Sequence, residues 1–176
     1  MNKLVICYIG QDVQDFLPLS LDSVKDVANA IVFIDGGSTD NTKNILISHP
    51  YQFSGSIFIT EHKDDLQGRN WLINRNYEHD HKGANGRARN CYLDFVKKHF
   101  KGWWCLVLDP DEMVDDRLKD FLKSKEIETI TENHVLSIHM RHTIRDLATE
   151  DATVQQHFVH NRFFRVSDDL FYPEHE

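Results

Sequence analysis

The chain has 176 residues, a hydrophobic content of 40% and a formal net charge of −8. The length fits a single domain over residues 1–176, and the hydrophobic content excludes a disordered chain. The negative charge argues against a nucleic-acid-binding surface, so an anionic substrate would need a bound cation or a few well-placed arginines. The three cysteines lie far apart without metal-binding spacing, which predicts reduced thiols.

The sequence shows no targeting or membrane segment. Residues 1–20 lack the basic start and the sustained apolar core of a signal peptide. No apolar run approaches the length of a membrane span. We therefore expect a cytoplasmic protein without a transmembrane segment.

Apolar runs and helical periodicity alternate along the first part of the chain. Lys3–Ile9 predicts a buried strand, and apolar residues at helical spacing predict a helix over Gln11–Val27. Ala30–Ile34 predicts a second strand, which a turn connects to a short helix ending near Ser48. Ser56–Thr60 predicts a third strand. This alternation indicates an α/β fold, Rossmann-like, with a mostly parallel central sheet flanked by helices.

The second half continues this pattern after a polar stretch. Residues 61–86 predict a long loop or a short helix beside the site, and Asn85–Phe100 carries one apolar stripe typical of a helix. A short helix and two strands are expected, in this order, over Arg117–Lys123, Val135–Met140 and His157–Val166.

The stretch Trp103–Glu112, WWCLVLDPDE, is an apolar run that ends in carboxylates. Such a run predicts a buried parallel strand, and ligands bind beyond the carboxyl ends of these strands. Pro110 favours extended geometry before it, so Asp109 and Asp111 point to the same side. Two such carboxylates can hold a hard divalent cation together with substrate phosphates. The alternative is an acidic helix N-cap.

A second motif, Asp35-Gly36-Gly37-Ser38, follows the second strand. Asp35 can accept hydrogen bonds from a nucleotide's base or ribose. The glycines permit close approach of a ligand to the backbone, and the next helix begins where phosphate can bind. The alternative is simple turn chemistry. Neither a dinucleotide-binding fingerprint nor a P-loop occurs in the chain.

A third motif places arginines at the start of the helix over Asn85–Phe100. A cation there opposes the helix macrodipole. Arg89 is therefore either a solvated side chain or an arginine aimed at a diphosphate.

Four segments in register resemble family 2 glycosyltransferases, which have the GT-A fold. The closing segment looks like the one ending in His-Glu in the lipopolysaccharide-core glucosyltransferase branch. The four segments are IVFIDGGSTDNT (31–42), NGRARNCYLDF (85–95), WWCLVLDPDEMV (103–114) and HNRFFRVSDDLFYPEHE (160–176).

The resemblance assigns roles to the residues of these motifs. It implies that Asp35 contacts the nucleotide base, with Gly37 and Ser38 also in the substrate-binding turn. It implies that Asp109 and Asp111 bind Mn²⁺ or Mg²⁺ on the diphosphate. A further implication is that Arg89 lies near the nucleotide.

The closing His-Glu of the resemblance falls on His175 and Glu176. It implies a general base at Glu176, and a metal-binding or positioning role at His175. Relatives continue beyond this point into acceptor-binding or membrane-attached helices. The chain is thus expected to be a minimal or truncated transferase, or one whose acceptor site a partner completes.

The resemblance implies a metal-assisted, inverting hexosyltransferase with Asp111 and Glu176 as its catalytic residues. It would move a sugar from a nucleoside-diphosphate sugar, with a UDP-sugar favoured, to the hydroxyl of a glycan or other acceptor. The alternatives are a nucleotidyltransferase, which also uses an acidic metal site, and a non-catalytic module that binds nucleotide sugars.

Overall fold

The computed structural model describes residues 3–48, 56–61, 84–130, 135–139 and 159–172. Within this part of the chain, six strands form one sheet in the order β3-β2-β1-β4-β6-β5. The strands are β1 (Leu4–Gly10), β2 (Ala30–Asp35), β3 (Ser56–Glu61), β4 (Trp104–Leu108), β5 (Val135–His139) and β6 (Val159–Arg165). The helices are α1 (Leu17–Val24), α2 (Thr42–Ser48), α3 (Ala84–His99) and α4 (Asp116–Lys123), with a 3₁₀ turn at Lys125–Thr129.

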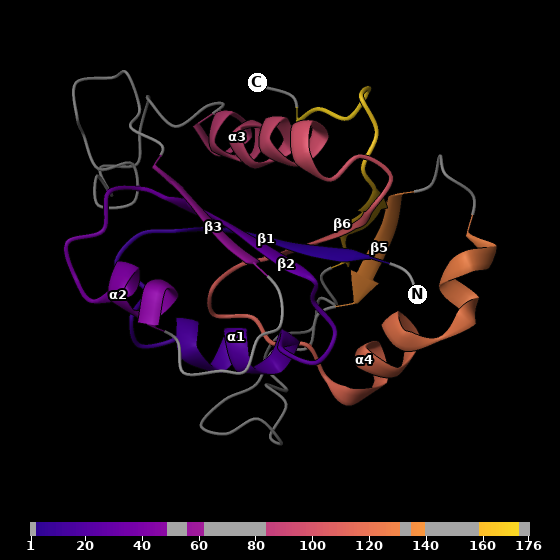
Figure 1. The fold of residues 1–176 in the computed structure, drawn as a ribbon, viewed down its shortest axis with the longest axis horizontal. Coiled ribbons are helices and arrows are strands. Elements are labelled where there is room, and N and C mark those ends of the chain that lie inside the picture. Colours follow the sequence, from indigo (N-terminus) through magenta and orange to yellow (C-terminus); the bar gives the residue numbers. More distant parts are fainter. Residues whose placement is uncertain (1–2, 49–55, 62–83, 131–134, 140–158, 173–176) are drawn as a thin grey trace.

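The sheet is mostly parallel, which confirms the prediction from the sequence. Strands β1, β2, β3 and β4 run in the same direction, whereas β6 pairs antiparallel with β4 and β5 pairs antiparallel with β6. The long connections between the parallel strands carry the helices, as parallel pairing requires. The result is an α/β sheet flanked by four helices in the described part of the chain (Figure 1).

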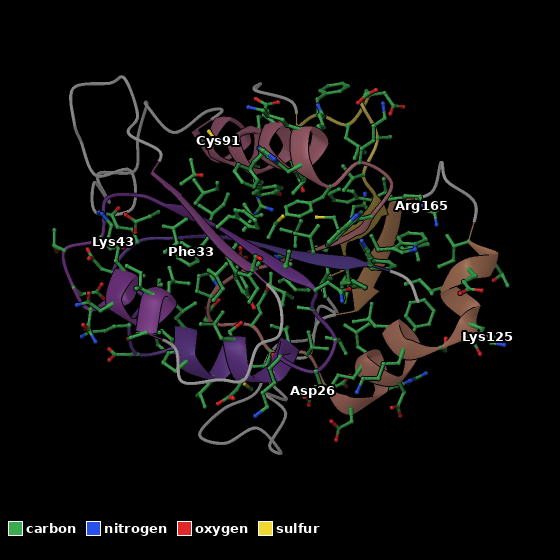
Figure 2. The ribbon with its side chains drawn as sticks, in the orientation of Figure 1. Asp26, Phe33, Lys43, Cys91, Lys125 and Arg165 are labelled. Atoms are coloured by element: carbon green, nitrogen blue, oxygen red, sulfur yellow. The ribbon has the colours of Figure 1, made fainter. Side chains whose placement is uncertain are left out.

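Helices cover both faces of the sheet: α3 lies on one face, and α1, α2 and α4 lie on the other (Figure 1). Successive residues of a strand point to opposite faces, so β1 contributes to two cores. Ile6 and Tyr8 pack with α1, while Val5 and Cys7 pack with α3. Phe33 of β2 belongs to the α1 side (Figure 2). A strand buried on both faces reads as a continuous apolar run, which is why these strands could be predicted.

The first helix is shorter than expected. The sequence predicted a helix over Gln11–Val27, but α1 spans only Leu17–Val24. The backbone N–H groups of Val13 and Gln14 donate instead to Thr42 Oγ1 (2.9 Å) and Asp40 Oδ2 (3.1 Å). These bonds tie the residues before α1 to the segment that follows β2, and the left-handed backbone of Asp12 (φ +52°) interrupts the predicted helix there.

The remaining differences are small. Strand β3 and helices α3 and α4 differ from the predicted bounds by one residue at one or both ends, within the usual disagreement over boundaries. Residues 62–83, most of the predicted long loop, lie outside the described residues, as do parts of the last two predicted strands. No described helix is long and apolar enough to cross a membrane.

The three cysteines form no disulfide, in line with the reduced thiols predicted from their spacing. Cys7 and Cys105 are fully buried on neighbouring strands, with their Sγ atoms 3.5 Å apart. Burial raises the pKa of the Cys7 thiol, and its proximity to Cys105 adds to this. Cys91 lies on α3 (Figure 2). Buried thiols with raised pKa values are inert.

Candidate active site

The candidate site lies where the carboxyl ends of β1, β2 and β4 meet. The order β3-β2-β1-β4 places β2 on one side of β1 and β4 on the other, so the sheet has its topological switch point between β1 and β4. Ligands of open α/β sheets bind at such a point. Gly10 ends β1 there, and a Cβ at this position would lie 2.9 Å from side-chain atoms of both Phe33 and Pro110. Only glycine therefore lets the DPDE segment pack onto the end of β1.

Asp35 is fully buried at the end of β2 and organises the turn that follows it. Its Oδ2 accepts the N–H groups of Gly37 and Ser38, both at 3.1 Å, and its Oδ1 accepts that of Ser38 at 3.2 Å. Lys43, which lies on α2 (Figure 2), forms an ion pair with the same carboxylate at 3.3 Å. The turn chemistry noted as an alternative in the sequence is therefore present in the structure.

Gly37 occupies the exposed side of this turn. Its φ of +93° is a left-handed conformation that side chains rarely adopt. Within the described part of the chain, no atom lies within 4 Å of where its Cβ would be. The turn therefore offers bare backbone and open space next to the switch point.

Asp12 joins the loop after β1 to the loop after β2. Its Oδ1 accepts the N–H groups of Thr39 at 2.7 Å and Asp40 at 3.2 Å, and its own N–H donates to Ser38 Oγ at 3.0 Å. The φ of Asp12 is +52°, which only a short polar side chain adopts readily among non-glycine residues. Sequence reasoning did not identify this residue, because its partners lie 26 to 28 residues away.

Asp109, at the end of β4, is paired with two arginines. Arg162 Nη2 lies 3.0 Å from its Oδ2, and Arg89 Nη2 lies 3.8 Å from its Oδ1. The second distance is too long for a hydrogen bond. The Asp109 side chain is 41% exposed, and Asp111 is exposed. The structure thus brings Arg89 and Asp109 together.

Glu112 is a further carboxylate of the site. Its Oε2 accepts the N–H of Asp109 at 2.7 Å and the Nη1 of Arg162 at 2.8 Å. Burial raises the pKa of Glu112 to about 7, although the Asp109 N–H and Arg162 act in the opposite direction. The alternative interpretation of this segment was an acidic helix N-cap, but α4 begins later, with Asp115 as its N-cap.

Arg162 of β6 is the main site residue that sequence reasoning missed. It lies 50 and 53 residues from its partners along the chain. It reaches them because β6 pairs antiparallel with β4, with Phe163 opposite Leu106. The only sequence signal is a charged residue inside an apolar strand, since such a residue is rarely buried without a partner.

The segment after β6 is fixed beside Arg89. Asn90 Nδ2 donates to the Tyr172 carbonyl at 3.0 Å, and the Tyr172 N–H donates to Asn90 Oδ1 at 2.8 Å. The Arg89 guanidinium lies 5.6 Å from the centre of the Tyr172 ring, a distance typical of a cation–π contact. The chain thus returns to the site at Tyr172. His175 and Glu176 lie outside the described residues.

The carboxylates can hold a cation only with help from a ligand. No group of three or more His, Cys, Asp or Glu side chains that could hold a metal occurs in the described part of the chain. The Asp109 side chain is 41% exposed, with Oδ1 facing Arg89 at 3.8 Å, and Asp111, two residues further along the chain, is also exposed. Mg²⁺ typically binds one or two carboxylates plus substrate phosphates and water. This donor set therefore fits a small divalent cation that binds together with a diphosphate.

The sheet order and the two covering layers define a GT-A-like α/β fold. No family model matches the chain, and no curated protein matches its sequence. Solved structures of S. aureus TarS have the same fold: they match 98% of this chain, at 15–16% sequence identity and TM-scores of 0.54 to 0.59.

One structure is that of TarS; it has a TM-score of 0.59, and the match covers 30% of it. The other two are of TarS residues 1–349, and the match covers 50% of each. One of these two was solved in complex with UDP and has a TM-score of 0.54. The chain thus spans half or less of each TarS structure that it matches.

Proposed function

We propose that this chain transfers a sugar from a UDP-sugar to an acceptor hydroxyl, with inversion at the anomeric carbon. The observation that carries the proposal is the position of Asp109 beside Arg89 at the switch point of a GT-A-like sheet. The fold likeness to TarS, which was crystallised with UDP, supports the choice of nucleotide. The motif resemblance to family 2 glycosyltransferases supports the reaction. The closing motif favours the lipopolysaccharide-core branch, with a hexose as the transferred sugar.

The diphosphate of the donor binds between Arg89 and the carboxylates in this proposal. Asp109 and Asp111 would hold Mn²⁺ or Mg²⁺, which when bound stabilises the charge that develops on the leaving diphosphate. Arg89 donates charge-assisted hydrogen bonds to the phosphate oxygens. At 3.8 Å from Asp109, Arg89 makes no short hydrogen bond to that carboxylate.

The base and ribose bind at the turn formed by Asp35, Gly37 and Ser38. The open space over Gly37 admits a flat ligand to the backbone. Asp35 is buried and holds the N–H groups of the turn. In this proposal Asp35 acts on base selection mainly by fixing the shape of the turn. Asp35 contacts the base directly only if the base lies against the turn.

The acceptor's proton passes to Glu176 in this proposal, with His175 as a metal ligand or positioning residue. Tyr172 supports this assignment because Asn90 fixes it beside Arg89. Four residues span at most about 14 Å, so the carboxylate of Glu176 can reach the donor site from Tyr172. A carboxylate at that place can accept the proton as the hydroxyl attacks.

A thermal-shift panel of UDP-, GDP-, CMP- and dTDP-sugars, each with Mn²⁺ and with EDTA, tests the proposal. A ligand that binds only the folded state raises its apparent stability. We expect the largest shift with a UDP-sugar and Mn²⁺, followed by slow release of UDP from that donor. Binding without transfer or hydrolysis would indicate a non-catalytic binding module. Release of pyrophosphate from a nucleoside triphosphate would indicate a nucleotidyltransferase.

A further inference from the structure

Arg162 is a buried cation whose guanidinium spans two carboxylates. Its side chain is 7% exposed. Nη1 donates to Glu112 Oε2 at 2.8 Å, and Nη2 donates to Asp109 Oδ2 at 3.0 Å. Arginine can make this bridge because its donors form a planar fork, whereas a lysine offers a single point charge.

The bridge fixes which carboxylate oxygens remain free. Glu112 Oε2 receives both the Arg162 guanidinium and the N–H of Asp109, so this carboxylate is turned back onto the end of β4. Oδ2 of Asp109 is taken by Arg162. Oδ1 of Asp109 faces Arg89 Nη2 at 3.8 Å, too far for a hydrogen bond, so this oxygen and the exposed carboxylate of Asp111 remain for a ligand.

We propose that Arg162 is a positioning residue that sets the cation preference of the site by leaving a single oxygen of Asp109 for the cation. This proposal rests on the proposed function, in which Asp109 and Asp111 hold the cation of the donor diphosphate. With Arg162 in place, Oδ2 of Asp109 and Oε2 of Glu112 are occupied, so neither carboxylate can bind the cation through both of its oxygens. The site then suits a small cation with six ligands, several of them phosphate and water.

Calcium responds differently to this restriction. Ca²⁺ takes six to eight oxygen ligands and often uses bidentate carboxylates, whereas Mg²⁺ keeps near-octahedral geometry with several waters. Mn²⁺ also suits octahedral oxygen sites. Releasing Oδ2 of Asp109 and the carboxylate of Glu112 therefore favours Ca²⁺. Without Arg162, the Asp109 carboxylate also loses the partner that fixes its orientation, and a small octahedral cation needs a fixed ligand orientation.

The test compares Arg162→Lys with the wild type. The dissociation constants of Mn²⁺ and of Ca²⁺ are measured by calorimetry in the presence of saturating UDP, and the melting temperature is measured without ligand. We expect the preference for Mn²⁺ over Ca²⁺ to fall by about tenfold or more. Mutation of a residue that orients a metal ligand typically lowers metal affinity by about 10- to 100-fold. Arg165→Lys is the matched control, since Arg165 lies on the same strand but stacks 5.2 Å from the Trp104 ring (Figure 2). Its preference should remain that of the wild type.

A second variant protects the test against misfolding. Loss of the Arg162 charge alone leaves two carboxylates without their cation, which is strongly destabilising for buried pairs. The double variant Arg162→Met/Glu112→Gln removes the cation together with one carboxylate and still frees Oδ2 of Asp109. An unchanged Mn²⁺/Ca²⁺ preference in either folded variant, with metal-dependent UDP binding in the wild type, overturns this inference alone. Metal-independent UDP binding in the wild type overturns the proposed metal site and this inference with it.

Discussion

Both carboxylate oxygens of Asp35 accept the backbone N–H of Ser38, at 3.1 and 3.2 Å, in the turn after β2. Oδ2 also accepts the N–H of Gly37. The carboxylate is fully buried and faces Lys43 at 3.3 Å. The residue that the sequence points to for base recognition is thus also the residue that holds the turn after β2 together.

We therefore expect Asp35→Asn to affect stability and binding together. The amide has one acceptor oxygen and places N–H groups against other donors, so the free energy of unfolding should fall by about 1–3 kcal/mol. Affinity for uridine, UMP and UDP should fall by the same factor, because the base site is common to all three. Urea unfolding and calorimetry measure the two effects, with Asp26→Asn on the exposed surface as the control. Unchanged stability would contradict the role of Asp35 in the turn.

Arg89→Ala should weaken binding of the diphosphate specifically. Hydrogen bonds to charged groups contribute about 1.5–3 kcal/mol, so we expect UDP affinity to fall by about 10- to 100-fold. Uridine affinity should not change, because the nucleoside carries no phosphate. Calorimetry with uridine, UMP and UDP measures this, and Arg89→Lys should retain part of the UDP affinity. An equal loss for uridine would show that Arg89 acts on the fold instead.

Asp111→Asn should reduce metal-dependent binding without unfolding the protein. Asp111 is exposed, so the change removes one anionic oxygen and leaves the core as it is. UDP affinity in Mn²⁺ should fall towards its value in EDTA, while the melting temperature stays close to that of the wild type. Asp120→Asn, an exposed aspartate on α4, is the control. Equal UDP affinity in Mn²⁺ and in EDTA for the wild type would exclude the metal role.

The strands and the end of β4 could be predicted because their signals are local. The run Trp104–Leu108 is buried on both faces, which makes it continuous in the sequence, and Asp109 follows directly. A parallel sheet follows from the alternation of strands and helices. These features need no knowledge of which strands are neighbours.

The remaining features depend on contacts between distant segments. Arg162 meets Asp109 and Glu112 only through the antiparallel pairing of β6 with β4, and neither periodicity nor spacing gives that register. The predicted helix over Gln11–Val27 is shortened because Asp12 has a left-handed backbone (φ +52°) and the residues after it bond to Asp40 and Thr42, so α1 begins only at Leu17. Helical periodicity does not report these contacts.

Glu112 should make stability depend on pH in a particular direction. Burial raises its pKa to about 7 in the folded state, whereas an unfolded glutamate has a pKa of about 4.3. The folded state therefore binds more protons between these values, and stability falls as pH rises through that window. The Glu112→Gln variant lacks this pH-dependent contribution to stability. From pH 5 to pH 7.5, the melting temperature of the wild type should therefore fall relative to that of the variant.

Thermal unfolding across that pH range measures the difference between the two proteins. Each 1 kcal/mol shifts the melting temperature of a domain of this size by about 2–4 °C. Glu126→Gln, an exposed glutamate, is the control and should follow the wild type. A difference between Glu112→Gln and the wild type that stays constant from pH 5 to pH 7.5 would show that Glu112 does not titrate in this window.

Glu176→Gln tests the proposed general base. Asn90 holds Tyr172 beside Arg89, and Glu176 follows four residues later, within reach of the donor site. Removing a general base typically lowers the rate by ~10²–10⁴-fold. We expect that loss in sugar transfer, or in slow hydrolysis of the donor, with UDP-sugar affinity unchanged because the amide keeps the shape of the side chain. Glu174→Gln is the matched control in the same segment and should keep its turnover. Full turnover in Glu176→Gln would place the base in another residue.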